Sequence, residues 1–255
     1  MQASAPTVDA GAPAVVLSPH LDDAVWACFS LLAGDEPVVV ATVFAGIPQA
    51  GVGWWDRECG ITDSAAHVRR RRGEDAATLA TLGRRALHLP LLDDQYRNGD
   101  STEPAEIAAE LREQVPAVSR VYAWAGIGHP DHLIVRDTGL ALARAGVPVT
   151  LVSDYCYNTR RGWPTWIAAD GQAAADEQWR DVLGDALGDG ITRPRVVRLD
   201  DHQSERKLAA MKGYVTQFDN IEREEPSWQD DGLPPSDPRK RVIEVFYDLD
   251  HRPPA

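Results

Sequence analysis

Residues 14–23 read AVVLSPHLDD and join a short apolar run to a polar cluster. Its first four residues are small and apolar, and the run stops at Ser18-Pro19, which predicts a short buried strand. Residues 22–33 are apolar and rich in helix-forming residues, which predicts a helix. The polar group His20-Leu21-Asp22-Asp23 is therefore expected between the carboxyl end of a strand and the start of a helix.

The same alternation of strand and helix continues along the chain. Residues 37–44 are rich in valine and predict a second buried strand. Strands that alternate with helices favour an α/β fold, with a mostly parallel sheet and helices on both faces. In such a sheet a ligand binds beyond the carboxyl ends of the strands. Further strands are predicted at 86–91, 120–125, 148–153 and 195–199, and further helices at 64–82, 103–115, 131–145, 172–187 and 204–218.

Charge and composition exclude several classes of partner. The chain has 39 acidic and 26 basic residues, for a formal net charge of -13, which disfavours nucleic acid and acidic lipid surfaces. No stretch approaches the roughly 18 apolar residues that a membrane helix needs. Residues 1–13 lack a signal-peptide pattern, and the three cysteines form no paired motif, so we expect a cytoplasmic protein. Homo-oligomer formation is left open.

A second polar cluster, His129-Pro130-Asp131-His132, also follows a predicted strand and opens a predicted helix. Residues three apart share one face of a helical turn, so His20 and Asp23 are expected to converge on one point. Asp22 is rotated by about 100° from Asp23 and stays available for proton transfer. One of His129 and His132 is expected to complete a metal site, while the other faces the substrate.

Two imidazoles and one carboxylate are typical of a catalytic zinc site that keeps its fourth position for water. The competing interpretation is structural, because Asp22 or Asp131 alone would commonly cap a helix. Two such clusters, both at strand ends, are harder to explain in that way. A non-catalytic binding protein of doubly wound fold is the alternative of another class, but no Gly-x-Gly-x-x-Gly loop follows the first strand.

The two clusters together resemble a known family. The first is similar to the His-Pro-Asp-Asp motif of the PIG-L/LmbE-like deacetylases, although Leu21 replaces the usual proline and Ala24 a common glutamate. The second is similar to the family's His-x-Asp-His motif. The resemblance extends over a core of residues 14–220 and is also carried by Arg71-Arg72-Gly73-Glu74, by Leu92-Asp93 with Gln95-Tyr96-Arg97, and by Lys207 to Gln217 with Tyr214.

The resemblance implies a Rossmann-like fold, with residues 1–255 as a single domain, and a polar C-terminal arm is expected at 221–255. It also implies removal of an N-acyl group, usually acetyl from an amino sugar, with Zn²⁺ or another divalent cation. Carried over by position, the metal ligands would be His20, Asp23 and His132. Asp22 would be the general base and His129 would polarise the carbonyl. Arg71 and Asp93 would contact sugar hydroxyls.

The substrate is a small molecule whose identity the sequence leaves open. An N-acyl amino sugar is expected, and the alternative is a non-sugar amide such as a thiol conjugate or a natural-product intermediate. Trp54 and Trp55 lie in the long irregular segment 45–63. They either pack within that segment or stack on a sugar face, and we include them among the candidate substrate contacts.

Overall fold

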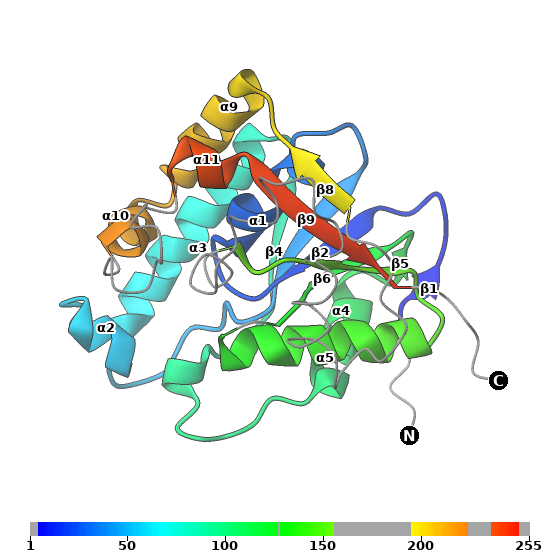
Figure 1. The fold of residues 1–255 in the computed structure, drawn as a ribbon. Helices are drawn as coiled ribbons and strands as arrows, with labels where there is room; N and C mark the ends of the chain where they lie inside the picture. The colour runs from blue at the N-terminus through cyan, green and yellow to red at the C-terminus, as the bar shows by residue number, and fades with distance from the viewer. Residues whose placement is uncertain (1–4, 127, 156–194, 224–235, 250–255) are drawn as a thin grey trace.

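The computed structural model describes residues 5–126, 128–155, 195–223 and 236–249. Its centre is a seven-stranded sheet of order β4-β3-β2-β6-β7-β9-β8 (Figure 1). The first five strands in this order are parallel, and β9 runs antiparallel to both of its neighbours. The strands are β2 (Ala14–Ser18), β3 (Val38–Thr42), β4 (Arg85–His88), β6 (Val121–Trp124), β7 (Val149–Val152), β8 (Arg195–Arg198) and β9 (Ile243–Asp248). The predicted α/β class with a mostly parallel sheet is confirmed.

Helices cover both faces of the sheet. Figure 1 shows α4 (Pro104–Gln114) and α5 (Pro130–Arg144) on one face, and α1 (Asp23–Leu32), α3 (Ser64–Thr81) and α9 (Asp201–Met211) on the other. Within the described residues, none of the helices is long and apolar enough to cross a membrane. The smaller elements are β1 (Thr7–Val8), β5 (Ala117–Val118), α2 (Trp54–Glu58), the 3-10 turn η1 (Asp94–Tyr96), α10 (Val215–Arg223) and α11 (Pro238–Arg241).

The strand order reverses between β2 and β6. From β2 the chain moves outward through β3 to β4, and then it returns to place β6 on the other side of β2. This is the Rossmann-like arrangement, in which a ligand binds in the crevice beyond the carboxyl ends of the two strands at the reversal. The clusters at His20 and at His129 follow β2 and β6, so the fold places both at this point.

Apolar residues fill both faces of the central strands. Every residue of β2 and β3 is buried, which explains why these strands are continuous apolar runs rather than alternating ones. Helix α1 packs on this sheet through Val25, Phe29 and Leu32, each fully buried. The core therefore supports the short segment after β2 that carries His20 and Asp22, and the start of α1 at Asp23.

The C-terminal part of the chain departs from the prediction. The interpretation of residues 221–255 as a surface arm is wrong for β9, which lies between β7 and β8 and buries Val245, Phe246 and Tyr247. The predicted helix at 204–218 is two helices, α9 and α10, separated around Gly213. The predicted helix at 172–187 lies outside the described residues.

A buried ion pair joins this C-terminal strand to the rest of the fold. Lys207 Nζ on α9 lies 2.8 Å from Glu244 Oε1 on β9, and both side chains are fully buried. Helix α1 leaves helical geometry at Cys28, and the N–H of Ser30 in the following turn donates to Glu244 Oε2 at 2.9 Å. One carboxylate thus connects α1, α9 and β9.

We predict that Lys207→Met destabilises the protein by about 3–5 kcal/mol, because it leaves the Glu244 carboxylate buried without its cation. Urea unfolding of the metal-free protein measures this loss. The control is Lys212→Met, which removes an exposed lysine just after the same helix. Equal unfolding midpoints for the two variants would contradict the stabilising role of the pair.

Candidate active site

The first polar cluster is fixed by the turn between β2 and α1. Ser18 Oγ donates to the carbonyl of His20 at 2.8 Å and accepts the N–H of Ala24 at 3.1 Å. Within the described residues the side chain of Asp22, at the N-terminal boundary of α1, makes no capping hydrogen bond. The structural interpretation of Asp22 as a helix cap is therefore not supported, and its carboxylate is left for other contacts.

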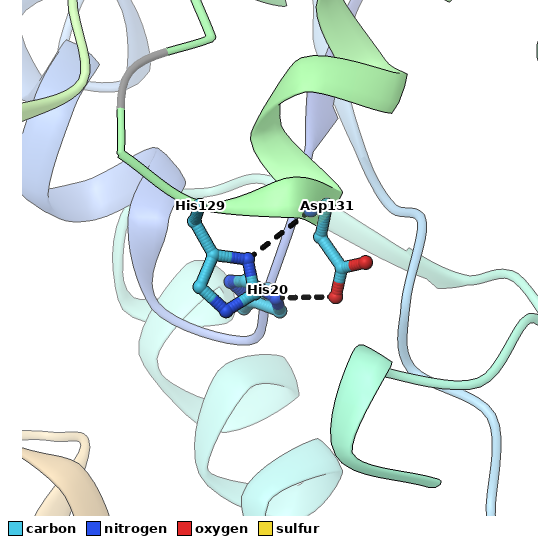
Figure 2. Close-up of side chains that lie close together, drawn as sticks. All are labelled: His20, His129 and Asp131. Carbon is cyan, nitrogen blue, oxygen red and sulfur yellow. Dashed lines mark hydrogen bonds and ion pairs between the residues drawn. The ribbon is translucent and has the colours of Figure 1, made fainter. Parts of the chain in front are cut away.

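The second cluster is fixed by the start of α5. The residue that caps this helix is His129, whose Nδ1 accepts the N–H of Asp131 at 3.2 Å. The Asp131 carboxylate instead points to His20, with Oδ2 3.0 Å from His20 Nε2 (Figure 2). The rings of His20 and His129 meet edge to face at 4.8 Å between centroids. The two clusters thus form one site.

Two candidate ligand nitrogens converge on one carboxylate oxygen. Asp23 Oδ2 lies 3.2 Å from His20 Nδ1 and 3.3 Å from His132 Nε2. These two nitrogens and a carboxylate oxygen all lie within 4.8 Å of one another. Tetrahedral zinc with bonds of about 2.0–2.1 Å places neighbouring ligand atoms about 3.3 Å apart. The spacing and chemistry of His20, Asp23 and His132 therefore fit a zinc ion.

A second group, His20, His129 and Asp131, also meets the distance condition for a metal. Its carboxylate is already engaged, because Asp131 Oδ1 lies 2.6 Å from Arg97 Nη2 and Oδ2 accepts the N–H of Asp94 at 3.1 Å. A guanidinium at this distance repels a cation. This group is therefore the weaker candidate for the metal.

Buried carboxylates set the charge of the two candidate histidine ligands. Burial alone would lower the pKa of His132, but Asp23 and Asp154 outweigh it and raise the pKa to about 9. Burial would also lower the pKa of His20, but the hydrogen bonds of its ring to Asp131 and Asp23 outweigh burial and raise the pKa well above the usual value. For Asp23, burial is outweighed by the two imidazoliums, which hold its pKa well below the usual range.

The pKa of Asp22 is raised whereas that of Asp23 is lowered, and the pKa of His129 is lowered whereas those of His20 and His132 are raised. Burial raises the pKa of Asp22 to about 6, although the guanidinium of Arg71 opposes this, and Asp23 adds to the increase. Burial, together with the cationic forms of His20 and His132, lowers the pKa of His129 to about 3. The ring of His129 is thus held neutral.

The structure places Arg71 and Asp93 beside these ligands. Arg71 on α3 is buried, and its Nη2 lies 3.5 Å from Asp22 Oδ2. Asp93 Oδ2 lies 3.9 Å from His20 Nε2, and its Oδ1 accepts the N–H of Gln95. The fold thus brings the predicted side chains to one site from the end of β2, from α3, from the start of η1 and from α5.

Trp54 and Trp55 lie on α2, and their rings meet edge to face at 5.9 Å. Trp54 is 49% exposed to solvent. Helix α2 is joined to η1 through Asp56, which accepts the Tyr96 hydroxyl at 2.7 Å and whose N–H donates to Gln95. The two tryptophans are thus connected to the segment that carries Asp93, rather than to the histidines directly.

Sequence reasoning missed the carboxylates behind the two histidines. Asp131 was considered as a helix cap, yet it contacts His20. Asp154, which follows β7, lies with its Oδ1 2.5 Å from His132 Nδ1. The carboxyl end of this strand was expected to carry chemistry, so the position was predictable, although the residue was not.

Comparison with known proteins identifies the family. The family model described as PIG-L, GlcNAc-PI de-N-acetylase, matches residues 15–143, which include both clusters and slightly more than half of the chain. The chain belongs to this family. None of the curated proteins matches the chain.

Solved structures of deacetylases resemble this PIG-L chain over nearly its whole length. The A40926 pseudoaglycone deacetylase Dbv21 is 27% identical, with 95% of this chain and 98% of that chain covered and a TM-score of 0.62. A triple mutant of the deacetylase of teicoplanin biosynthesis, Orf2*T, is 25% identical, with 93% and 98% covered and a TM-score of 0.66. The zinc-inhibited form of teicoplanin deacetylase Orf2 is 23% identical over the same shares, with a TM-score of 0.68.

PIG-L membership confirms three predictions: the Rossmann-like fold, the enzyme class and the need for a divalent metal. The chain is a metal-dependent N-deacetylase. The alternative of a non-catalytic binding protein of the same fold is set aside, because the metal-binding group and the family agree.

We predict that zinc binding to the metal-free protein releases at least one proton at pH 7.5. With the pKa of His132 raised to about 9, its imidazole holds a proton that a zinc ion bound to this candidate ligand would displace, and so the apparent affinity is expected to fall as the pH decreases below about 9. Titration calorimetry in two buffers of different ionisation enthalpy measures the release. Equal heats in both buffers would show that no proton is displaced.

Proposed function

We propose that this PIG-L protein removes an N-acetyl group from a glycosyl unit of a small molecule, with His20, Asp23 and His132 as metal ligands. The observation that carries the proposal is the approach of His20 Nδ1 and His132 Nε2 to the same oxygen of Asp23, at 3.2 and 3.3 Å. When bound there, a divalent metal would polarise the amide carbonyl and favour deprotonation of water.

Asp22 is the general base of the proposed reaction. Its carboxylate is buried beside Asp23 and makes no capping hydrogen bond with the described part of α1. Its Oδ2 contacts Arg71 Nη2 at 3.5 Å, which orients the carboxylate without a tight ion pair. From this position it takes the proton of the attacking water and passes it to the leaving amine.

His129 is the proposed hydrogen-bond donor to the amide oxygen. Its Nδ1 accepts the N–H of Asp131 at 3.2 Å, so the neutral ring carries its proton on Nε2. The helix start thereby selects the tautomer that donates toward the site. A donor of this kind stabilises the negative charge that develops on the carbonyl oxygen as water attacks.

The substrate class follows from the polar residues around these groups. Arg71 and Asp93 offer a donor and an acceptor suited to sugar hydroxyls, and Trp54 presents a half-exposed ring that suits the apolar face of a sugar. The relatives support a glycosylated natural product, since one is described as a pseudoaglycone deacetylase and another structure as a deacetylase–teicoplanin complex. A cytoplasmic location and a homo-oligomer stay predictions.

We predict that Asp22→Asn keeps about one zinc per chain but lowers kcat by about 10²- to 10⁴-fold, because an amide cannot accept the proton. Metal analysis and steady-state kinetics measure both properties. Asp35→Asn, an exposed aspartate beyond α1, is the control and retains normal kcat. Near-normal turnover by Asp22→Asn would rule out its role as the base.

His132→Ala tests the ligand assignment separately. It is expected to lose zinc binding, because one of the three donors is removed. Stoichiometric zinc in purified His132→Ala protein would refute that assignment, and the proposed mechanism with it.

We predict that N-acetylglucosaminyl compounds are hydrolysed with a kcat/KM at least about ten times that of simple acylated amines, because sugar hydroxyls can hydrogen-bond to Arg71 and Asp93 and simple acylated amines lack such hydroxyls. A panel of both substrate types, assayed for free amine, measures the ratio. An equal or higher kcat/KM for non-sugar amides would favour a thiol conjugate or another natural-product intermediate as the substrate.

A further inference from the structure

Asp154 lies just after β7, and its side chain is fully buried. Both of its carboxylate oxygens are engaged. Oδ1 lies 2.5 Å from His132 Nδ1, and Oδ2 accepts the N–H of Gly126 at 2.9 Å. The carboxylate therefore joins the ends of β6 and β7 to the first turn of α5.

The contact with His132 fixes which ring nitrogen carries a proton. A carboxylate oxygen only accepts hydrogen bonds, so the neutral ring must carry its proton on Nδ1. The lone pair is then on Nε2, which is the nitrogen that faces Asp23 Oδ2 at 3.3 Å. An imidazole binds a metal only through such a lone pair.

We propose that Asp154 is a positioning residue that fixes the tautomer and orientation of His132 and so sets the metal affinity of the site. This inference rests on the proposed function, in which His132 is a metal ligand. Carboxylates that accept from the distal nitrogen of a metal-bound histidine commonly change metal affinity by about 10- to 100-fold.

The backbone of Gly126 fixes the orientation of the Asp154 carboxylate. Its φ is +80°, and a Cβ there would lie 3.0 Å from Cβ of Arg136 and 3.3 Å from the carbonyl of His132. The end of β6 is thus packed against the turn of α5 that carries His132. Its N–H has a fixed direction and holds Oδ2 of Asp154, which leaves Oδ1 for the imidazole.

The substitution Asp154→Asn tests this arrangement with little change of volume. The Gly126 N–H needs an acceptor, so the amide oxygen of the asparagine turns to Gly126 and its NH₂ group faces His132. The NH₂ group donates to Nδ1 and forces the ring proton onto Nε2, where it blocks the metal. The variant therefore favours the wrong tautomer while keeping the strand ends joined.

We expect Asp154→Asn to bind zinc about 10- to 100-fold more weakly than the wild type in competition with a chromophoric chelator. Asp137→Asn, which changes an exposed aspartate on α5, the helix that carries His132, is the matched control and binds zinc normally. Circular dichroism of both metal-free variants reports whether the fold is retained. Wild-type zinc affinity in a folded Asp154→Asn protein would overturn the inference.

A second measurement uses the wild-type protein, so the inference stays testable if the variant fails to fold. Proton–nitrogen correlation spectra of the zinc-loaded protein distinguish a proton on Nδ1 of His132 from a proton on Nε2. We expect the proton on Nδ1, and a proton on Nε2 would overturn the inference. If His132→Ala retains zinc, the proposed function itself fails. If His132→Ala loses zinc while folded Asp154→Asn does not, only the role of Asp154 fails.

Discussion

The carboxylate of Asp23 contacts two imidazoles that come from opposite halves of the sheet. His20 follows β2 and His132 lies in α5 after β6, and both approach the same oxygen. Strands β2 and β6 are neighbours at the point where the strand order reverses, so their carboxyl ends open into one crevice. The proposed chemistry depends on this adjacency, because neither cluster alone supplies two nitrogens and an oxygen at the spacing that zinc requires.

Buried ion pairs and hydrogen bonds fix the positions of the helices and strands around these candidate ligands. Asp131 and Asp154 lie behind the two histidines, and Arg97 neutralises Asp131 at 2.6 Å. On the other side of the sheet, Asp75 on α3 accepts the Tyr214 hydroxyl at 2.9 Å and contacts His88 at 2.8 Å. A buried carboxylate without such a partner is strongly destabilising, so these contacts restrict how α3 can move relative to β4 and how α5 can move relative to His20.

The sequence predicts the local elements and the first contacts of the site, but not the long-range ones. Apolar runs before polar clusters located β2 and β6, and three-residue spacing selected His20 with Asp23. The strand β9 was missed because it has only six residues and follows a charged, proline-rich segment. Such a short apolar pattern does not distinguish a sheet strand from a surface arm. The pairing of Asp154 with His132, 22 residues away, depends on how β7 meets α5, and no spacing rule encodes it. His129 as the cap of α5 was likewise missed, because aspartate is the commoner cap.

Anomalous diffraction at the zinc edge, on crystals of the metal-loaded protein, tests the ligand assignment most directly. We expect one ion bound by His20 Nδ1, Asp23 Oδ2 and His132 Nε2, each at about 2.0–2.2 Å. An ion bound instead by His129 and Asp131, with His132 outside its coordination shell, would refute the assignment of His20, Asp23 and His132 as the metal ligands.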